Sequence, residues 1–414
     1  MSKFDEKLFG RINQSWAGME ADEFISFLRP KIKEVLTEEE FRNRLKKGDK
    51  LRVKFGIDPT ARDIHLGHIV PILVLRQFVQ AGHHVDLIIG DFTARIGDPS
   101  GRETARTPLT SADIAANQLT YQEQIGKYLD VSKISVHRNS DWLLGVSLDK
   151  FFAILQSLNL AQATQREDFR ARARNQQGVS LAEVCYGVLM GIDSVQLKSN
   201  IEIGGIDQLL NFQQCRTVMG ACGLTEEVVL TTPILEGISG DGKKMSKSYG
   251  NYIAVNASLE DKFGKIMSIP DRLILDYFCL FTLIKEDEVA ELKQFIASDP
   301  LEAKKQLATL VVAWETSSLD LARSERERFE RKFSERLIQD EDVTTVKVKT
   351  GDTLINALFS SGKFGSRSEL RRLFAENAVR ELGQTESVIP IEKVVDSTMS
   401  VRAGRRKFFK VIPE

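Results

Sequence analysis

The chain has 414 residues, 42% of them hydrophobic and 28% charged, with a formal net charge of −1 at pH 7. This length exceeds one comfortable hydrophobic core, so two or three domains are expected. The balanced charge excludes a protein that binds nucleic acid over its whole surface, and any such surface must be a local patch. No apolar run approaches the length that crosses a bilayer. The four cysteines form no disulfide framework and the first residues lack a signal peptide's apolar core, so a cytoplasmic location is expected.

The front of the chain is predicted to be helical and to lead into a strand, a turn and a helix. Within residues 1–50, the stretches 22–28 and 38–45 place apolar residues at helical spacing. A strand over 51–55 breaks at Gly56, and an apolar helix follows over 66–79. This order places the N-terminus of the helix against whatever lies at the carboxyl end of the strand.

Two histidines stand at that helix N-terminus. His65 and His68 are three residues apart, so both can point from the same face, and Gly67 between them lets a flat group lie close to the backbone. The pair can donate to a phosphate chain, or it can simply cap the helix. A zinc site needs a ligand spacing that the nearby Asp58 and Asp63 do not supply, so no protein-bound metal is predicted.

Strand-like runs then alternate with helical stretches as far as residue 232. The predicted strands cover 85–90, 134–139, 201–203 and 228–232, and the predicted helices cover 113–129, 147–158, 181–189 and 208–219. This alternation predicts an α/β fold with a doubly wound, Rossmann-like parallel sheet. The loop over 91–102 is rich in glycine and aspartate and follows a strand, which is where open α/β sheets bind ligands.

The segment 242–251 is a second candidate phosphate site. It is rich in glycine and serine and carries Lys244 and Lys247 three residues apart, a composition typical of a mobile phosphate clamp. The same composition also suits an ordinary solvated basic loop.

The rest of the chain divides into a helical region and a basic tail. Residues 258–339 are predicted to be helical, and the charge run near their end indicates a solvated helix face. Residues 340–349 look like a linker. From Val346 to Glu414, thirteen Lys and Arg stand against eight Asp and Glu, a net charge of +5. The expected domains are therefore a helical segment 1–50, a Rossmann-like domain 51–250 that includes the loop 242–251, a helical domain with linker 251–345, and a small α+β domain 346–414.

The two candidate phosphate sites together resemble a known pair of motifs. His65-Leu66-Gly67-His68 and Lys244-Met-Ser-Lys-Ser248 resemble the signatures of class I aminoacyl-tRNA synthetases. Further segments resemble the tyrosyl-tRNA synthetases of bacteria: Gly56–Thr60, Ile96–Gly101, Asn139–Trp142 and Gly204–Gln208. The tail segment Ser366–Arg380 resembles the RNA-binding module that these enzymes share with ribosomal protein S4.

The resemblance implies an activity, its substrates and its partners. Such an enzyme activates L-tyrosine with ATP to tyrosyl-adenylate, releases pyrophosphate and transfers the tyrosyl group to tRNA. It implies ATP as a substrate that carries Mg²⁺ with it, tRNA and tyrosine or a related amino acid as partners, and a homodimer, with no membrane or DNA partner. Two alternatives stay open: a synthetase paralogue that activates another tyrosine-like amino acid, and a catalytically silent RNA-binding protein on the same scaffold.

The resemblance also assigns roles to residues of this sequence. The expected catalytic residues are His65, His68, Lys244, Lys247, Arg102 and Arg106. The expected ATP-binding residues are Gly56, Asp58, Thr60, His65, Gly67, His68, Gly205, Asp207, Lys244, Met245, Ser246, Lys247 and Ser248. The expected amino-acid-binding residues are Lys54, Gly56, Asp98, Asn139, Tyr186, Met190, Asp193 and Gln208. Arg371, Arg372, Arg405, Arg406 and Lys407 are expected to bind tRNA.

Three residues of the expected amino-acid pocket depart from the family pattern. Met190 stands where the family has a glutamine, Lys54 where it usually has a tyrosine, and Ile206 where it has a small polar residue. A lost hydrogen bond to a charged group is worth about 1.5–3 kcal/mol. An ion pair between Lys54 and Asp193 would occupy the carboxylate that should accept the phenol proton. Alternatively, Lys54 is the normal residue of one branch of the family and Met190 is a tolerated change.

Overall fold

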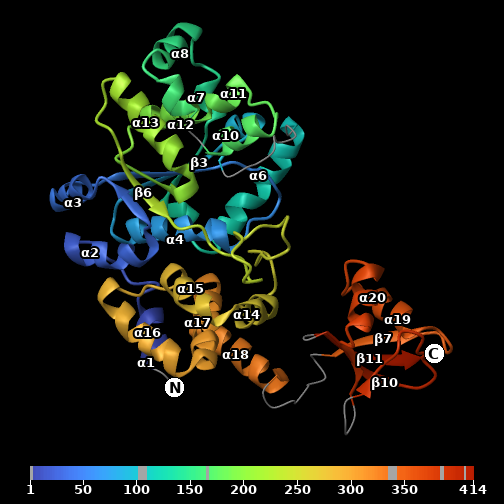
Figure 1. Cartoon of the computed structure of the whole chain (residues 1–414). Helices are drawn as coiled ribbons and strands as arrows, with labels where there is room; N and C mark the ends of the chain where they lie inside the picture. The colour runs from blue at the N-terminus through green and yellow to red at the C-terminus, as the bar shows by residue number, and fades with distance from the viewer. Residues whose placement is uncertain (1–2, 101–109, 165–166, 334–342, 383–386, 405–406) are drawn as a thin grey trace. The chain divides into compact units, whose positions relative to one another are not determined.

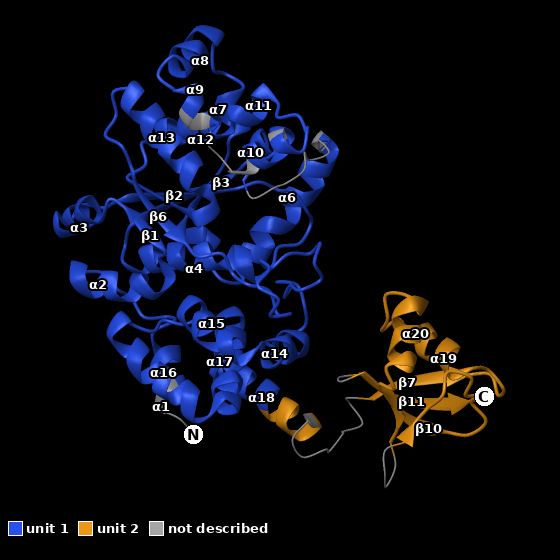
Figure 2. Cartoon of the chain, in the orientation of Figure 1, with its two compact units in different colours: residues 1–326 blue, residues 327–414 orange. Residues whose placement is uncertain are grey.

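The structure is a computed structural model that describes residues 3–100, 110–164, 167–333, 343–382, 387–404 and 407–414. The chain forms two compact units, residues 1–326 and 327–414 (Figure 2). Among the described residues, no helix combines the length and the apolar character that a membrane span requires.

Unit 1 is built on a six-stranded sheet with the order β1-β6-β5-β2-β3-β4. Its strands are β1 Glu34–Leu36, β2 Arg52–Ile57, β3 His84–Ile89, β4 Ser135–Arg138, β5 Ile201–Gly205 and β6 Val228–Thr232. All neighbours run parallel except β1, which pairs antiparallel with β6. The predicted doubly wound parallel sheet is confirmed. The prediction of an all-helical segment 1–50 is wrong at β1, because Val35 and its neighbours are too few to show a period and pair only through tertiary contact.

Helices cover the sheet on both sides. Figure 1 shows α12 and α13 on one side and α4 on the other. α4 is buried along most of its length because its residues are apolar on nearly every face. The helices of this part are α1 Lys3–Gly10, α2 Ala21–Leu28, α3 Glu38–Lys46, α4 Leu66–Gln80, α5 Thr93–Ile96, α6 Ser111–Gly126, α7 Ser140–Leu143, α8 Leu148–Leu155, α9 Leu160–Ala163, α10 Glu167–Arg174, α11 Leu181–Val184, α12 Tyr186–Leu197 and α13 Leu209–Ala221.

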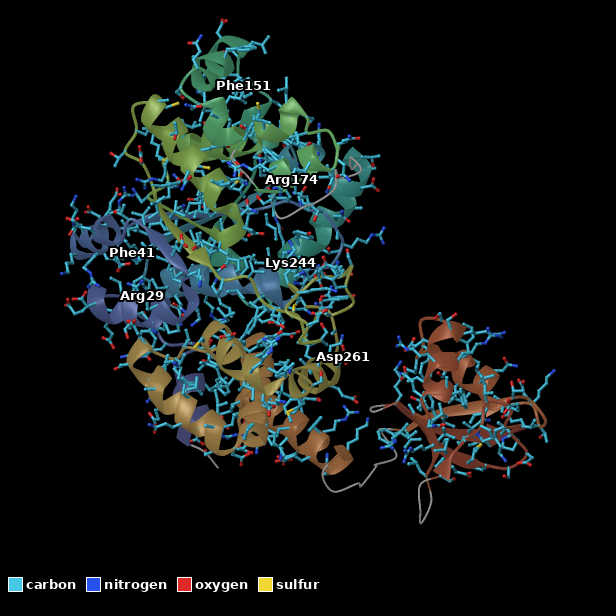
Figure 3. The ribbon with its side chains drawn as sticks, in the orientation of Figure 1. Arg29, Phe41, Phe151, Arg174, Lys244 and Asp261 are labelled. Atoms are coloured by element: carbon cyan, nitrogen blue, oxygen red, sulfur yellow. The ribbon has the colours of Figure 1, made fainter. Side chains whose placement is uncertain are left out.

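The remainder of unit 1 is helical. α14 Leu259–Met267, α15 Ile274–Phe281, α16 Val289–Ser298, α17 Pro300–Thr316 and α18 Leu319–Phe333 follow the sheet, and α18 runs on past the end of unit 1. α17 is the buried centre and packs against α14, α15, α16 and α1. Figure 3 labels Phe151 on α8, at the top of unit 1, and Asp261 on α14, in its lower helical part.

In its described residues, unit 2 contains the end of α18, a five-stranded sheet with the order β7-β11-β10-β8-β9, and the helices α19 and α20. Its elements are β7 Val343–Val348, α19 Leu354–Ser360, α20 Arg367–Ala375, β8 Val379–Glu381, β9 Ser387–Val388, β10 Met399–Ala403 and β11 Lys407–Pro413. The prediction of a linker over 340–349 is wrong at 343–348, because Val343–Val348 forms β7 and pairs in parallel with β11 over its whole length. Residues 340–342 lie outside the described residues. Val346 and Val348 belong to the apolar core of this unit.

Candidate active site

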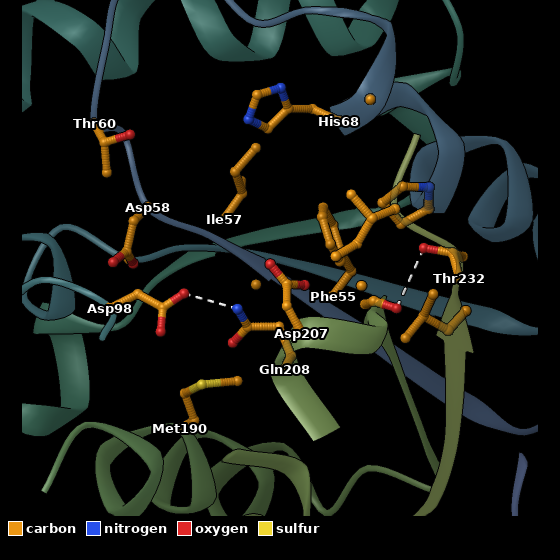
Figure 4. A pocket seen from close by; sticks show the side chains of 18 of the residues that line it. Phe55, Ile57, Asp58, Thr60, His68, Asp98, Met190, Asp207, Gln208 and Thr232 are labelled. Carbon is orange, nitrogen blue, oxygen red and sulfur yellow. Dashed lines mark hydrogen bonds between the residues drawn. The ribbon is translucent and has the colours of Figure 1, made fainter. Parts of the chain in front are cut away.

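A cavity of about 410 Å³ opens at the carboxyl ends of β2 and β5. These strands are neighbours in the sheet. From β2 the chain continues to β3 on one side, and from β5 it continues to β6 on the other side. Open α/β sheets bind ligands at such a switch point, since the loops that leave the two strands diverge and leave a crevice. Figure 4 shows the side chains that point into it.

His65 and His68 stand at one end of the cavity, where α4 begins. The Nδ1 atom of His65 accepts from the backbone N–H of Gly67 at 3.2 Å, and Nδ1 of His68 accepts from the N–H of His65 at 3.3 Å. A Cβ atom on Gly67 would lie 3.0 Å from the His65 ring, so glycine lets this cap form. Both histidines therefore cap the helix and also line the cavity.

Both imidazoles are neutral. Burial lowers the pKa of His65 to about 2 and the pKa of His68 to about 4. Lys244 and Lys247 lower the pKa of His65 further, because a second positive charge nearby is unfavourable. A neutral ring that accepts at Nδ1 carries its proton at Nε2. Each histidine is thus left with one Nε2–H donor.

The loop that carries Lys244 is held by Asn251 and by backbone hydrogen bonds. Asn251 accepts from the N–H of Ser246 at 2.8 Å and donates to the carbonyl of Lys244 at 3.1 Å. Met245 is buried, and its N–H donates to the carbonyl of Leu235 at 2.8 Å. These contacts place the backbone of the loop at the cavity wall.

The chain after this loop runs beside the two histidines. The N–H of Leu66 donates to the carbonyl of Ile253 at 3.0 Å, which ties the start of α4 to that segment. Lys247 lies outside the cavity wall, and its ammonium donates to the carbonyl of Asp63 at 2.5 Å.

Asp58 and Tyr186 form a hydrogen-bonded pair in the middle of the cavity. The Tyr186 hydroxyl donates to Oδ2 of Asp58 at 3.0 Å, and Thr93 donates to the other oxygen at 2.7 Å. Burial, with the charge of Asp58 next, raises the pKa of Tyr186 well above its ordinary value. Gly90 gives Asp58 room, since a Cβ there would lie 2.1 Å from its carboxylate.

Asp98 is held by amide donors. Gln208 donates to Oδ2 of Asp98 at 2.7 Å, the Ser100 N–H donates to Oδ1 at 2.9 Å, and Asn211 donates to the same oxygen at 3.4 Å. In Figure 4 the thioether of Met190 points toward Gln208. Asp98 is thus fixed by three donors before any ligand enters.

Asp193 forms the far end of the cavity. Trp142 Nε1 donates to Oδ1 of Asp193 at 2.7 Å, and Asn139 donates to Oδ2 at 3.3 Å. Burial raises the pKa of Asp193 to about 6, while Lys54 and these two donors oppose that rise. At neutral pH the group is a buried carboxylate able to accept a further proton donor.

Lys54 is fully buried and pairs with glutamates. Its ammonium lies 2.7 Å from Oε1 of Glu202 and 4.0 Å from Oε1 of Glu227, and it donates to the carbonyl of Met190 at 3.3 Å. The ion pair between Lys54 and Asp193 that the sequence suggested is not formed, because Glu202 lies directly beside Lys54 in the β2–β5 register. Asp193 therefore stays available to a ligand.

Comparisons with known proteins place the chain in one family. The family described as tRNA synthetases class I (W and Y) matches residues 46–334. The chain is 37% identical over 405 residues to the tyrosine–tRNA ligase of Symbiobacterium thermophilum, covering 96% of this chain and 99% of that protein. It is 39% identical over 405 residues to that of Carboxydothermus hydrogenoformans, covering 94% and 98%. The chain belongs to the class I tRNA synthetases.

A solved structure agrees in fold. The tyrosyl-tRNA synthetase from Archaeoglobus fulgidus complexed with L-tyrosine superposes with a TM-score of 0.60 at 24% identity, covering 74% of this chain and 100% of that chain. The family membership that the two motifs indicated is confirmed.

The cavity of this synthetase brings together most of the residues singled out in the sequence. Those that line it are Gly56, Asp58, Thr60, His65, Gly67, His68, Asp98, Asn139, Tyr186, Met190, Asp193, Gly205, Asp207, Gln208, Lys244, Met245 and Ser246. Lys54, Ile206, Lys247 and Ser248 are not among its lining residues. Arg102 and Arg106 lie outside the described residues. The change at Ile206 therefore does not alter the cavity wall, whereas the change at Met190 does.

Several residues of the site were missed in the sequence, and four of them make the side-chain contacts that hold its carboxylates or pair with Lys54. Thr93 and Asn211 hold Asp58 and Asp98, Trp142 holds Asp193, and Glu202 both lines the cavity and pairs with Lys54. Trp142 lies in a motif that carried the resemblance, so its place three residues after Asn139 was an available signal. For Glu202, the available signal was its position inside a buried strand, because a buried carboxylate needs a positively charged or hydrogen-bonding partner.

The predicted RNA-binding residues lie in unit 2. Arg371 and Arg372 are exposed on α20, while Lys407 donates to the carbonyl of Lys363 at 2.6 Å and lies 3.3 Å from Glu369. Arg405 and Arg406 lie outside the described residues. Phe408 and Phe409, which follow Lys407 in β11, are both buried and so are not available to stack on RNA bases.

Proposed function

We propose that this synthetase is a tyrosine–tRNA ligase that works in the cytoplasm. It joins the carboxylate of L-tyrosine to the α-phosphate of ATP, releases pyrophosphate, and passes the tyrosyl group to the terminal ribose of tRNA. The observation that carries this proposal is one cavity with phosphate donors at one end and a buried hydroxyl acceptor at the other. The names of the full-length relatives support the same activity.

The first step is an in-line phosphoryl transfer, which needs positioning and positive charge but no protein nucleophile. The Nε2–H groups of His65 and His68 donate to the polyphosphate, and they do so as neutral rings that bring no charge penalty when the site is empty. Lys244 supplies the positive charge that balances the leaving pyrophosphate. Lys247 joins it after leaving the carbonyl of Asp63.

The remaining groups hold the two substrates in line. Asp207 lines the cavity and offers two oxygens to a ribose diol. Asp98 and Tyr186 receive the ammonium of the amino acid. Asp193 accepts the phenol proton, since Trp142 and Asn139 already donate to it and fix its direction.

Mg²⁺ arrives with ATP as part of the substrate. In the described residues, the group of side chains that could ligate a metal is Glu202, Cys215 and Glu227. This group already faces the ammonium of Lys54, 2.7 Å from Glu202. We therefore place the magnesium on the phosphates and not in this cluster.

Transfer to tRNA uses unit 2. Its basic surface includes Arg371 and Arg372 on α20, which are exposed and can reach phosphates of folded RNA. Lys407, Arg405 and Arg406 are also proposed to bind tRNA.

The active form is a homodimer. Three apolar side chains beside α7 and on α8 are strongly exposed in the single chain: Leu144 is 69%, Leu148 is 74% and Phe152 is 59% exposed. Solvent-facing apolar groups gathered in one segment mark an interaction site. We propose that a second copy of the chain covers these residues, because the family resemblance implies a homodimer.

An ATP–pyrophosphate exchange assay with a panel of amino acids tests the proposal. Tyrosine should support exchange at micromolar to millimolar concentration, and phenylalanine should not. Met190 in the cavity wall favours one alternative, a synthetase that activates another tyrosine-like amino acid. Exchange with such an amino acid and none with tyrosine would replace the first proposal with that one.

A further inference from the structure

The cluster of buried charges around Lys54 adjoins the end of the cavity that Asp193 forms, and Glu202 is the member that lines the cavity. Lys54, Glu202 and Glu227 are each at most 1% exposed. Side-chain oxygens of Glu202 and Glu227 and the thiol of Cys215 all lie within 4.8 Å of one another. The ammonium of Lys54 thus faces two carboxyl groups and lies near the carboxylate of Asp193. Buried charges that share one partner cost folding free energy, so we expect the cluster to perform a function.

The cluster is attached to the turn of α12 that carries Asp193. Lys54 donates to the carbonyl of Met190, three residues before Asp193, at 3.3 Å. The hydroxyl of Ser194, the next residue after Asp193, lies 2.9 Å from Oε1 of Glu227 and 3.2 Å from the same carbonyl. These three contacts hold the chain on both sides of Asp193.

The cluster also sets the charge around Asp193. Facing it are Lys54 from β2, Glu227 beside β6, and Tyr186 from α12, with the neutral donors Trp142 and Asn139. Lys54 is the positive group among them and favours the ionised form, whereas Glu227 opposes it. Glu202 and Cys215 complete the groups around Lys54.

We propose that Lys54 is a positioning residue that sets specificity: its ammonium holds the α12 turn and keeps Asp193 charged, so that the pocket prefers tyrosine to an amino acid whose ring has no hydroxyl. The inference rests on the proposed function, because it assigns Asp193 to the phenol. Lys54 touches no substrate and acts through Asp193 and Glu202.

Two substitutions with opposite charge effects test the inference. In the wild-type full-length chain, the KM for tyrosine in pyrophosphate exchange should rise as the pH falls through about 6, where Asp193 takes up a proton. In Lys54→Met, the midpoint of this increase in KM should lie at a pH higher by about one unit or more. This variant should also reduce the preference for tyrosine over phenylalanine at least tenfold in kcat/KM, with the KM for ATP unchanged.

Glu227→Gln should move the same rise to lower pH, because it removes a negative charge that faces Asp193. Lys54→Arg should restore the wild-type pH profile. A purely structural role predicts loss of activity in both variants without these opposite shifts. If Lys54→Met does not fold, the direction of the Glu227→Gln shift still decides.

The outcomes separate this inference from the proposed function. Wild-type protein without tyrosine-dependent exchange would overturn the function. Wild-type exchange with tyrosine, together with unmoved pH midpoints in Lys54→Met and Glu227→Gln, would overturn only the role of Lys54.

Discussion

The indole Nε1 of Trp142 donates a hydrogen bond of 2.7 Å to Oδ1 of Asp193, from a short helix that no long-range sequence pattern connects to α12. This bond lowers the pKa of Asp193 against the burial that raises it. A carboxylate fixed in this way can read a hydroxyl on a bound ring, because its remaining lone pairs point in defined directions.

Trp142→Phe should weaken tyrosine binding more than it slows catalysis. The variant loses one hydrogen bond to a charged group, worth about 1.5–3 kcal/mol. The pKa of Asp193 should rise above about 6, so the KM for tyrosine should climb at a higher pH than in the wild type. Pyrophosphate exchange between pH 5.5 and 8.5 measures both effects. Asp141→Asn, at an exposed neighbour on the same helix, is the matched control and should change neither.

Lys244→Ala should slow adenylate formation by about 10²–10³-fold, the loss typical of one donor that stabilises developing charge. Tyrosine binding, measured by equilibrium dialysis without ATP, should stay unchanged because the lysine lines the histidine end of the cavity. Lys243→Ala is the control, since that lysine lies outside the cavity wall and faces Asp241 at 3.4 Å. A large loss of tyrosine affinity in Lys244→Ala would contradict the assigned role.

The sheet and most of its helices could be predicted because each strand is a short β-rich run between helical stretches of clear period. β1 and β7 could not. β1 is three residues long and is defined only by its pairing with β6. In β7 the alternation of apolar and polar residues breaks at Thr344 and Thr345, and the pairing partners lie about sixty residues further along the chain. Local pattern carries no information about such long-range pairing.

The site divides in the same way. The histidines and Lys244 were predictable because short motifs hold them in fixed register. The partner of Lys54 was not predictable, because sequence spacing could not show that β2 and β5 are neighbours. This pairing of strands places Glu202, and not Asp193, in contact with the ammonium. Sequence supplied the chemical groups, and the strand order decided which of them pair.

Removal of residues 343–414 should spare pyrophosphate exchange and reduce tRNA charging. The cut belongs before β7, because β7 pairs with β11 along its full length and a cut at residue 346 would leave half a strand behind. Exchange and charging rates of the truncated and full-length proteins measure the effect. Equal loss of both activities would show instead that unit 2 supports the fold of unit 1.

Phe152→Asp should convert a dimer into monomers without unfolding them. The phenylalanine is 59% exposed in the single chain, so an aspartate there is readily solvated in a monomer but is strongly unfavourable in an apolar interface. Light scattering coupled to size-exclusion chromatography gives the mass. Ala153→Asp, on another face of α8, is the control and should leave the assembly intact. A wild-type protein that is already monomeric at micromolar concentration would refute the homodimer.

Lys31 should make the stability of the protein depend on pH in the alkaline range. It is fully buried, donates to the carbonyl of Thr282 at 2.5 Å, and has its pKa lowered by burial to about 7. Between pH 7 and the ordinary lysine value of 10.5, the unfolded chain holds a proton on this residue that the folded chain does not. The free energy of unfolding contributed by Lys31 therefore rises with pH across that window, and below it the cost of a buried charge is constant.

Urea unfolding of the wild type and of Lys31→Met at pH 7 and 9.5 should show the wild type gaining stability relative to the variant at the higher pH. Lys33→Met, at an exposed lysine two residues on, should show no such change, and parallel pH dependence of wild type and Lys31→Met would mean that Lys31 is charged in the folded protein.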